Sequence, residues 1–251
     1  MLPGLLRGEE KAEAAPPISD HPQFVLRATS FSKDHETLSF VGSLGDMDDA
    51  SWNHWKKNTA KIPHRDKVKA IFLNYGYISE VSLSYLCGFE NVEFLTLGIS
   101  IEGVTISSDT LKQLAGFRKL QYLTIAIHGL SGQHLNAISE GCGNLKELSI
   151  QFPSVHMITD DKPQMERWKA VSLDDGAVEE ISKIKSLESI WINHTPDESD
   201  GQVRFSEKAL LTLIKMPKLK SLCIRSDNFT KEGMKAIDKL NLPLFIKIPK
   251  S

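Results

Sequence analysis

The side chains best suited to chemistry in this sequence are three cysteines, eight histidines and two short acidic clusters. A structural zinc site needs thiolate or imidazole ligands in closely spaced pairs, such as C-x-x-C. Cys87, Cys142 and Cys223 lie far apart, so no such pair exists, and no histidine pairs with a cysteine locally. We therefore expect no metal site and no nucleophilic thiol, and we expect Cys142 to be a small buried apolar residue.

The acidic clusters lie at Asp46–Asp49 and Asp197–Asp200. A calcium loop needs ligands that alternate over about twelve residues and end in a glutamate, and neither cluster has that spacing. Helix caps and turns explain both clusters better. The sequence also lacks a phosphate-binding glycine motif, a nucleophile elbow and a paired-carboxylate signature. We therefore predict no catalytic residues and no cofactor, and we expect the protein not to be an enzyme.

Composition excludes several classes of partner. The 251 residues carry a formal net charge of −2, which gives no overall field for nucleic acid or an anionic membrane. The apolar runs are far shorter than the ~20 residues that span a bilayer. An odd number of cysteines does not suggest a disulfide framework, so a reducing compartment is favoured and we expect a cytoplasmic protein.

Apolar residues recur in a fixed frame. Six strings of six residues have apolar side chains at the first, fourth and sixth positions, and they begin at Val68 (VKAIFL), Val92 (VEFLTL), Leu120 (LQYLTI), Leu145 (LKELSI), Leu187 (LESIWI) and Leu219 (LKSLCI). A degenerate seventh string starts at Pro243 and keeps Ile246 and Ile248. Apolar residues that alternate in this way indicate a short strand with one buried face.

Each string from Val92 onwards follows a second apolar pattern. Apolar residues stand nine, six and three positions before it, as in Leu83, Leu86 and Phe89, and the copy before Leu145 has one extra residue. This spacing indicates an amphipathic helix. Helix-start residues precede several of these helices, at Ser107–Asp109, Ser131, Asp174 and Asp175, Ser206 with Glu207, and Thr230 with Glu232. Each unit is therefore a strand, a loop and a helix, and stacked units would share one core.

The strings resemble the leucine-rich-repeat consensus L-x-x-L-x-L. The segment GCGNLKELSI (Gly141 to Ile150) is similar to the ribonuclease-inhibitor-like, cysteine-containing subclass, and DDGAVEEISKIKSLESIWI (Asp174 to Ile192) is similar to bacterial-type repeats. The resemblance covers about Val68 to Ile248. It implies an α/β solenoid of about six or seven repeats, with parallel strands on the concave face and helices on the convex face.

One position departs from that family. Its usual asparagine, eight residues after each string begins, is replaced by Ser100, His128, Pro153, Thr195 and Asp227. We therefore expect irregular turns.

The repeat frame suggests a domain organisation. We predict a disordered tail over residues 1–20, an N-terminal cap or degenerate repeat over 21–67, and a repeat domain over 68–251. Within the cap, Thr37–Gly42 is a candidate strand and Asp48–Asn58 a candidate helix. A rim insertion is predicted at about 151–173, because the strings at Leu145 and Leu187 are unusually far apart.

The candidate binding residues are those predicted to point away from the core. On the concave face they are Phe72, Tyr75, Phe94, Tyr122, Glu147, Phe152, Trp191, His194 and Arg225, and in the rim loop they are Met157 and Trp168. Exposed aromatic and arginine side chains are common anchors of protein interfaces. The alternative is that the insertion folds over the face and buries some of these aromatics, with Met157 and Trp168 packing the loop in place.

The resulting hypothesis is a non-catalytic module that binds an unknown protein or peptide through its concave face and rim loop, with no nucleic acid and no membrane as partner. One alternative is a substrate-recognition subunit of a ubiquitin-ligase-type complex, although no convincing docking helix pair is visible. The other is an enzyme with a site between the rim insertion and the concave face.

Overall fold

The computed structural model describes residues 26–31, 37–42, 65–74, 83–84, 86–99, 106–127, 130–151, 173–193, 206–224, 229, 231–239 and 246–247. Its strands are β1 (Leu26–Phe31), β2 (Thr37–Gly42), β3 (Ala70–Asn74), β4 (Phe94–Ile99), β5 (Tyr122–Ile127), β6 (Glu147–Gln151), β7 (Ser189–Asn193), β8 (Ser221–Ile224) and β9 (Ile246–Lys247). Its helices are α3 (Ser108–Lys112), α4 (Gly132–Gly141), α6 (Asp175–Ser182), α7 (Glu207–Ile214) and α8 (Lys231–Ile237), with 3-10 turns η1 (Arg65–Lys67) and η2 (Gln113–Gly116).

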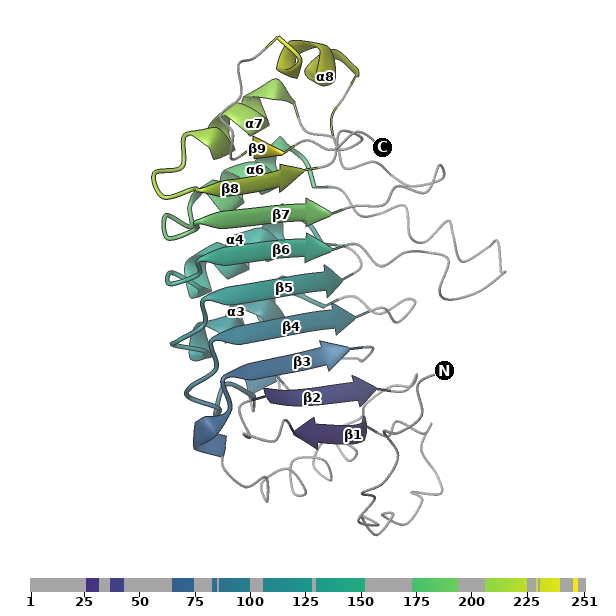
Figure 1. Ribbon diagram of the computed structural model, residues 1–251, viewed down its shortest axis with the longest axis vertical. Coiled ribbons are helices and arrows are strands. Elements are labelled where there is room, and N and C mark those ends of the chain that lie inside the picture. The colour runs from purple at the N-terminus through teal and green to yellow at the C-terminus, as the bar shows by residue number, and fades with distance from the viewer. Residues whose placement is uncertain are drawn as a thin grey trace, which may run out of the picture.

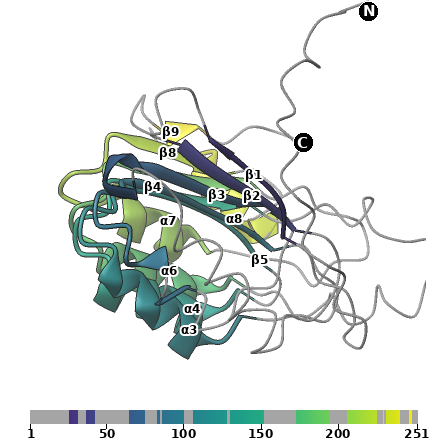
Figure 2. The same cartoon turned by 90° about the horizontal axis from the view of Figure 1, so that it is seen from below.

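The described strands form one nine-stranded sheet whose spatial order follows the chain from β1 to β9 (Figure 1). β1 and β2 pair antiparallel, and every later neighbouring pair is parallel. A parallel pair needs a crossover between its strands, and helices supply it from β4 to β8. Helices α3, α4, α6 and α7 lie on one face of the sheet (Figure 2). The predicted α/β class with alternating strands and helices is confirmed.

Strand register places equivalent positions of the repeat frame side by side. Leu123 pairs with Leu148, Leu148 with Ile190, and Ile190 with Leu222. These side chains are at most 1% exposed. The predicted sharing of one core by successive units is therefore confirmed for these strands.

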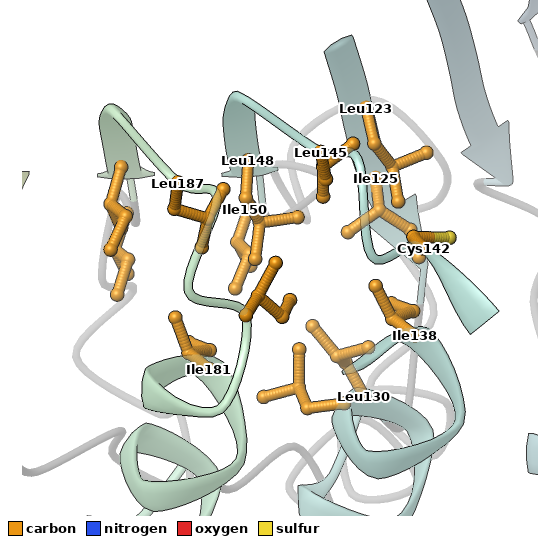
Figure 3. Packing of buried hydrophobic residues seen from close by; sticks show 14 of the residues in the cluster. Leu123, Ile125, Leu130, Ile138, Cys142, Leu145, Leu148, Ile150, Ile181 and Leu187 are labelled. Carbon is orange, nitrogen blue, oxygen red and sulfur yellow. The ribbon is translucent and has the colours of Figure 1, made fainter. Parts of the chain in front are cut away.

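The core lies between the sheet and the helices. Leu148 and Ile150 of β6 pack there with Ile181 of α6 and Ile138 of α4 (Figure 3). The three apolar helix positions predicted before each string from Val92 to Leu219 are buried. Each fully buried side chain of this size contributes roughly 1.5–3 kcal/mol relative to exposure, so this shared core is the main stabilising element.

Hydrogen-bonding caps start three of the helices. The side chains of Ser107, Asp174 and Ser206 accept hydrogen bonds from backbone N–H groups three residues ahead, at 3.0, 2.9 and 3.4 Å. These bonds satisfy donors that have no partner inside the helix. The predicted start signals at these positions are confirmed, whereas Thr230 lies outside the described residues.

Helix α4 uses a different cap. The backbone N–H of Ser131 donates to Nδ1 of His134 at 3.2 Å, which leaves Nε2 to donate to the carbonyl of Ile106 at 2.6 Å. The imidazole thus closes a capping box and also ties α4 to the segment before α3. Sequence patterns identified Ser131 but not this role of His134.

Side chains one position before the strings connect neighbouring turns. Asn91 donates to the carbonyl of Asp66 at 2.6 Å, and Asn144 donates to the carbonyl of Arg118 at 3.3 Å. Ser186 donates to a carbonyl of the preceding unit at 2.6 Å. Hydrogen bonds between successive units therefore recur in the turns that lead from a helix into a strand.

At the N-terminal edge, the predicted strand Thr37–Gly42 is confirmed as β2, but its antiparallel neighbour β1 was not predicted. The apolar frame describes strands joined by helical crossovers, and β1 needs only a short connection to β2. The predicted tail at 1–20, the helix at Asp48–Asn58 and residues 152–172 of the rim insertion lie outside the described residues.

Candidate binding face

One face of the sheet is left uncovered by the described helices. Because side chains alternate along a strand, residues between the buried positions turn away from the helix layer. We call this surface the open face, and its described side chains are Thr37, Ala70, Phe72, Phe94, Thr96, Tyr122, Thr124, Ala126, Glu147, Ser149, Gln151, Ser189, Trp191, Ser221 and Cys223. Figure 1 looks onto this face, with the helices behind the strands.

Parallel register arranges these side chains in rows that cross the strands. One row runs through Ala70, Phe94, Tyr122, Glu147, Ser189 and Ser221. The next row runs through Phe72, Thr96, Thr124, Ser149, Trp191 and Cys223. Neighbours within a row are about 4.8 Å apart, so residues far apart in the sequence form continuous surfaces.

Phe94 and Tyr122 form a stacked aromatic pair on β4 and β5. Their ring centroids are 4.2 Å apart and their planes differ by 5°. The separation is close to the strand spacing, so the rings stand side by side in register. Phe94 is still 40% exposed. The pair is therefore an ordered apolar feature that remains accessible to a partner.

Trp191 is the second exposed aromatic feature. Its side chain is 43% exposed, and its indole Nε1–H donates to Oγ of Ser189 at 2.8 Å. This bond satisfies the polar atom of the ring and holds the indole along its own strand. A side chain that is already ordered loses less conformational entropy when a partner binds it.

The space between the two aromatic features is lined by smaller polar residues. Ser149 is only 8% exposed, and its Oγ accepts a hydrogen bond from Gln151 at 3.5 Å. Glu147 is half-buried beside Tyr122 in the same row, and it is the one formally charged side chain among those described on the open face. The face therefore combines aromatic anchors with hydroxyl groups and little charge, a composition that suits a protein interface.

The structure places five of the predicted site residues, Phe72, Phe94, Tyr122, Glu147 and Trp191, on the open face. The other predicted site residues, Tyr75, Phe152, Met157, Trp168, His194 and Arg225, lie outside the described residues. Sequence reasoning missed Ser189, which orients Trp191. The available signal was a hydroxyl residue two positions before a tryptophan, because those two side chains share one face of a strand.

The described thiols near the helices are poor nucleophiles. Burial raises the pKa of Cys142 to about 12, and this side chain is 4% exposed, which confirms the expected core position. Burial also raises the pKa of Cys87 to about 11, and its single S–H can donate to the carbonyl of Leu83 or of Gln113, which lie 3.1 and 3.0 Å from Sγ. Both thiols therefore stay protonated near neutral pH.

A shallow groove of about 720 Å³ lies at the N-terminal ends of α3, α4 and α6. Its lining includes Lys112, Ser131, Gln133 and Glu180. Lys112 donates to Asp109 at 2.7 Å, and this hydrogen bond lowers the pKa of the Asp109 carboxyl. Within the part of the chain that the structure describes, no group of three or more histidine, cysteine or acidic residues is placed to hold a metal ion.

No protein-family model matches the sequence, and no curated protein matches it. Among the described helices, none is both long and apolar enough to cross a membrane.

Proposed function

We propose that the strand and helix units form a leucine-rich-repeat solenoid that works as a non-catalytic protein-binding module. The support is the recurrence of L-x-x-L-x-L strings whose aliphatic residues pair in register from β4 to β8. In such a solenoid the strands line the inner surface, which corresponds here to the open face.

One observation carries the binding proposal. Among the described residues, Phe94 and Trp191 are the two large hydrophobic side chains that remain exposed, and both lie on the open face. Exposed apolar groups that gather on one surface tend to mark interaction sites, whereas single scattered ones carry no such meaning. Aromatic side chains also supply much of the energy in protein interfaces. The open face is therefore the proposed contact surface for a protein or peptide.

Partner capture with matched variants tests the proposal. The variant Phe94→Ala/Trp191→Ala removes both anchors, and Lys112→Ala/Lys208→Ala removes two exposed side chains from the helix layer as a control. Each protein is immobilised, incubated with lysate of its source cells, and the bound proteins are quantified by mass spectrometry. Circular dichroism and thermal melting check that all three proteins are folded.

We expect the wild type and the control variant to retain the same protein, and the open-face variant to lose at least about 90% of it. Equal retention by a folded open-face variant would contradict the proposal. So would loss in the control variant alone, which would place the contact on the helix layer.

A further inference from the structure

Charge differs between the side of the sheet where the strands begin and the side where they end. Since β2 to β9 run parallel, the turns that lead from a helix into a strand lie next to one another where the strands begin. The four turns that lead into β5 to β8, at 116–121, 141–146, 183–188 and 215–220, contain eight lysine and arginine side chains and one carboxylate, that of Glu188. The turn into β4, at 88–93, differs, because it contains the carboxylates of Glu90 and Glu93 and no cation. Acidic residues lie instead at the helix starts, at Asp109, Asp174, Asp175 and Glu207. A protein with a net charge of −2 thus carries a concentrated cationic surface.

We call this surface the basic edge. All eight of its cationic side chains are exposed. Two of them form ion pairs, Lys183 with Glu180 and Lys220 with Glu188, both at 2.5 Å. The remaining six form no ion pair with a described residue, and they are Arg118, Lys119, Lys146, Lys185, Lys215 and Lys218.

Helix stabilisation accounts for part of the basic edge. Lys183 and Lys215 are the C-cap residues of α6 and α7, where positive charge complements the helix dipole. That effect fades beyond the last turn of a helix. Lys146 and Lys218 lie past the helix ends, beside strands β6 and β8. The hydrogen bond from Lys220 and the charges of Lys220, Lys146 and Lys218 lower the pKa of Glu188, but one carboxylate does not balance three lysines.

The spacing of the turns makes the cations act together. Strands β5 to β8 span about 14 Å at the usual strand separation, and the turns follow that spacing. Screening in physiological salt acts over about 8 Å, so cations on neighbouring turns reinforce each other's potential. An extended anionic chain laid across the strands would meet positive charge at each turn.

The basic edge lies next to the open face. Lys146 immediately precedes Glu147, which lies in the same row as Phe94 and Tyr122. A segment that crosses this row is therefore within side-chain reach of the basic edge. Among the described residues, neither exposed large hydrophobic side chain belongs to the basic edge. The edge therefore lacks the aromatic platform of single-stranded nucleic-acid sites and the apolar groups that insert into a membrane.

We infer that the basic edge binds an acidic segment of a protein partner, while neighbouring residues of that partner contact the aromatic pair on the open face. That the partner is a protein rests on the proposed function. That the bound segment is acidic rests on the charge distribution of the basic edge. Carboxylates of the segment would contact Lys146, Lys218 and their neighbours across the turns. Exposed pairs of this kind contribute individually little, so recognition depends on several acting together.

The test uses a fluorescein-labelled oligoglutamate peptide and an oligoglutamine peptide of equal length. Binding to the full-length protein is measured by fluorescence anisotropy at low and physiological salt. Lys146→Glu/Lys218→Glu reverses two charges of the basic edge, and Lys112→Glu/Lys208→Glu reverses two exposed lysines elsewhere. Phosphatidylserine vesicles and labelled oligothymidylate are measured in the same way.

We expect oligoglutamate to bind more tightly than oligoglutamine, and its affinity to fall with salt. The basic-edge variant should bind it about tenfold more weakly than the control variant, because two attractive contacts become repulsive. Carbodiimide, which couples carboxylates to lysine amines without a spacer, should cross-link the peptide to Lys146 or Lys218 in preference to Lys112 or Lys208.

Equal weakening by the two variants would overturn the inference, as would stronger binding of the vesicles or oligothymidylate than of oligoglutamate. Absence of oligoglutamate binding at low salt would overturn it as well. The outcome is separable from that of the proposed function. Loss of partner capture in Phe94→Ala/Trp191→Ala, together with unaffected capture by Lys146→Glu/Lys218→Glu, would leave the open face as the contact and exclude the basic edge.

Discussion

Gly116, the last residue of η2, and Gly143, in the turn before β6, occupy very different surroundings. A Cβ at Gly116 would lie 2.6 Å from Cβ of Cys87, whereas a Cβ at Gly143 would meet nothing within 4 Å. Glycine at 116 thus lets two neighbouring units approach closely. A larger side chain there must push the units apart.

We expect Gly116→Ala to lower the free energy of unfolding by about 1–3 kcal/mol, the usual cost of overpacking. Gly143→Ala should change it by less than about 0.5 kcal/mol. Urea denaturation of both variants measures the difference. Equal stability of the two would show that the units can separate at no cost.

The buried thiol of Cys142 predicts a pH dependence. An ordinary thiol has a pKa of 9.0, and burial raises that of Cys142 to about 12. The unfolded chain therefore releases this proton first as pH rises, and the stability due to the neutral thiol is lost between those two values. We expect the stability advantage of wild type over Cys142→Ala to shrink by about 1.4 kcal/mol from about pH 8 to pH 10. Urea titrations at both pH values measure it, and a constant difference would contradict the prediction.

Some residues at the helix starts both cap a helix and make hydrogen bonds to the neighbouring unit. Asp175, next to the cap of α6, accepts hydrogen bonds from both the backbone N–H and Oγ of Ser206, the cap of α7. His134 likewise links α4 to the carbonyl of Ile106. The start of one helix is therefore held in part by its neighbour, which couples the formation of adjacent units.

The cap of α6 gives a direct test. Asp174→Ala removes the acceptor of the Ala177 N–H and should lower the free energy of unfolding by about 1 kcal/mol. Asp174→Asn keeps an acceptor oxygen and should cost clearly less, because asparagine caps helices about as well. Chemical denaturation compares the two variants. An equal loss in the two variants would indicate that charge, and not the hydrogen bond, matters at this position, because both variants remove the charge.

Across the whole molecule, stability comes from contacts between units. Leu148 is fully buried in β6 and pairs with Leu123 of β5 and Ile190 of β7. Leu148→Ala should therefore cost about 2–5 kcal/mol through the cavity it leaves. Because the cavity is shared, we expect amide exchange to accelerate in β5 and β7 as well as in β6. Hydrogen exchange with mass spectrometry measures this, and acceleration confined to β6 would argue against a shared core.

The sequence by itself determined the repeated elements of this protein. The apolar spacing at Leu83, Leu86 and Phe89 and in VEFLTL reports helix and strand geometry directly, since a side chain three or four positions along a helix, or two along a strand, returns to the same face. The caps at Ser107, Asp174 and Ser206 are equally local. The strand β1 escaped prediction because it lacks that frame.

Tertiary structure decided which side chains meet. Phe94 and Tyr122 stack, and Lys146 lies at the same edge as Lys218, only because strands distant in the chain pair in a particular register. The net charge of −2 gave no hint of a cationic edge, because summing charge over a chain discards position. Local periodicity depends on neighbouring residues alone, whereas a surface depends on how separate elements are aligned.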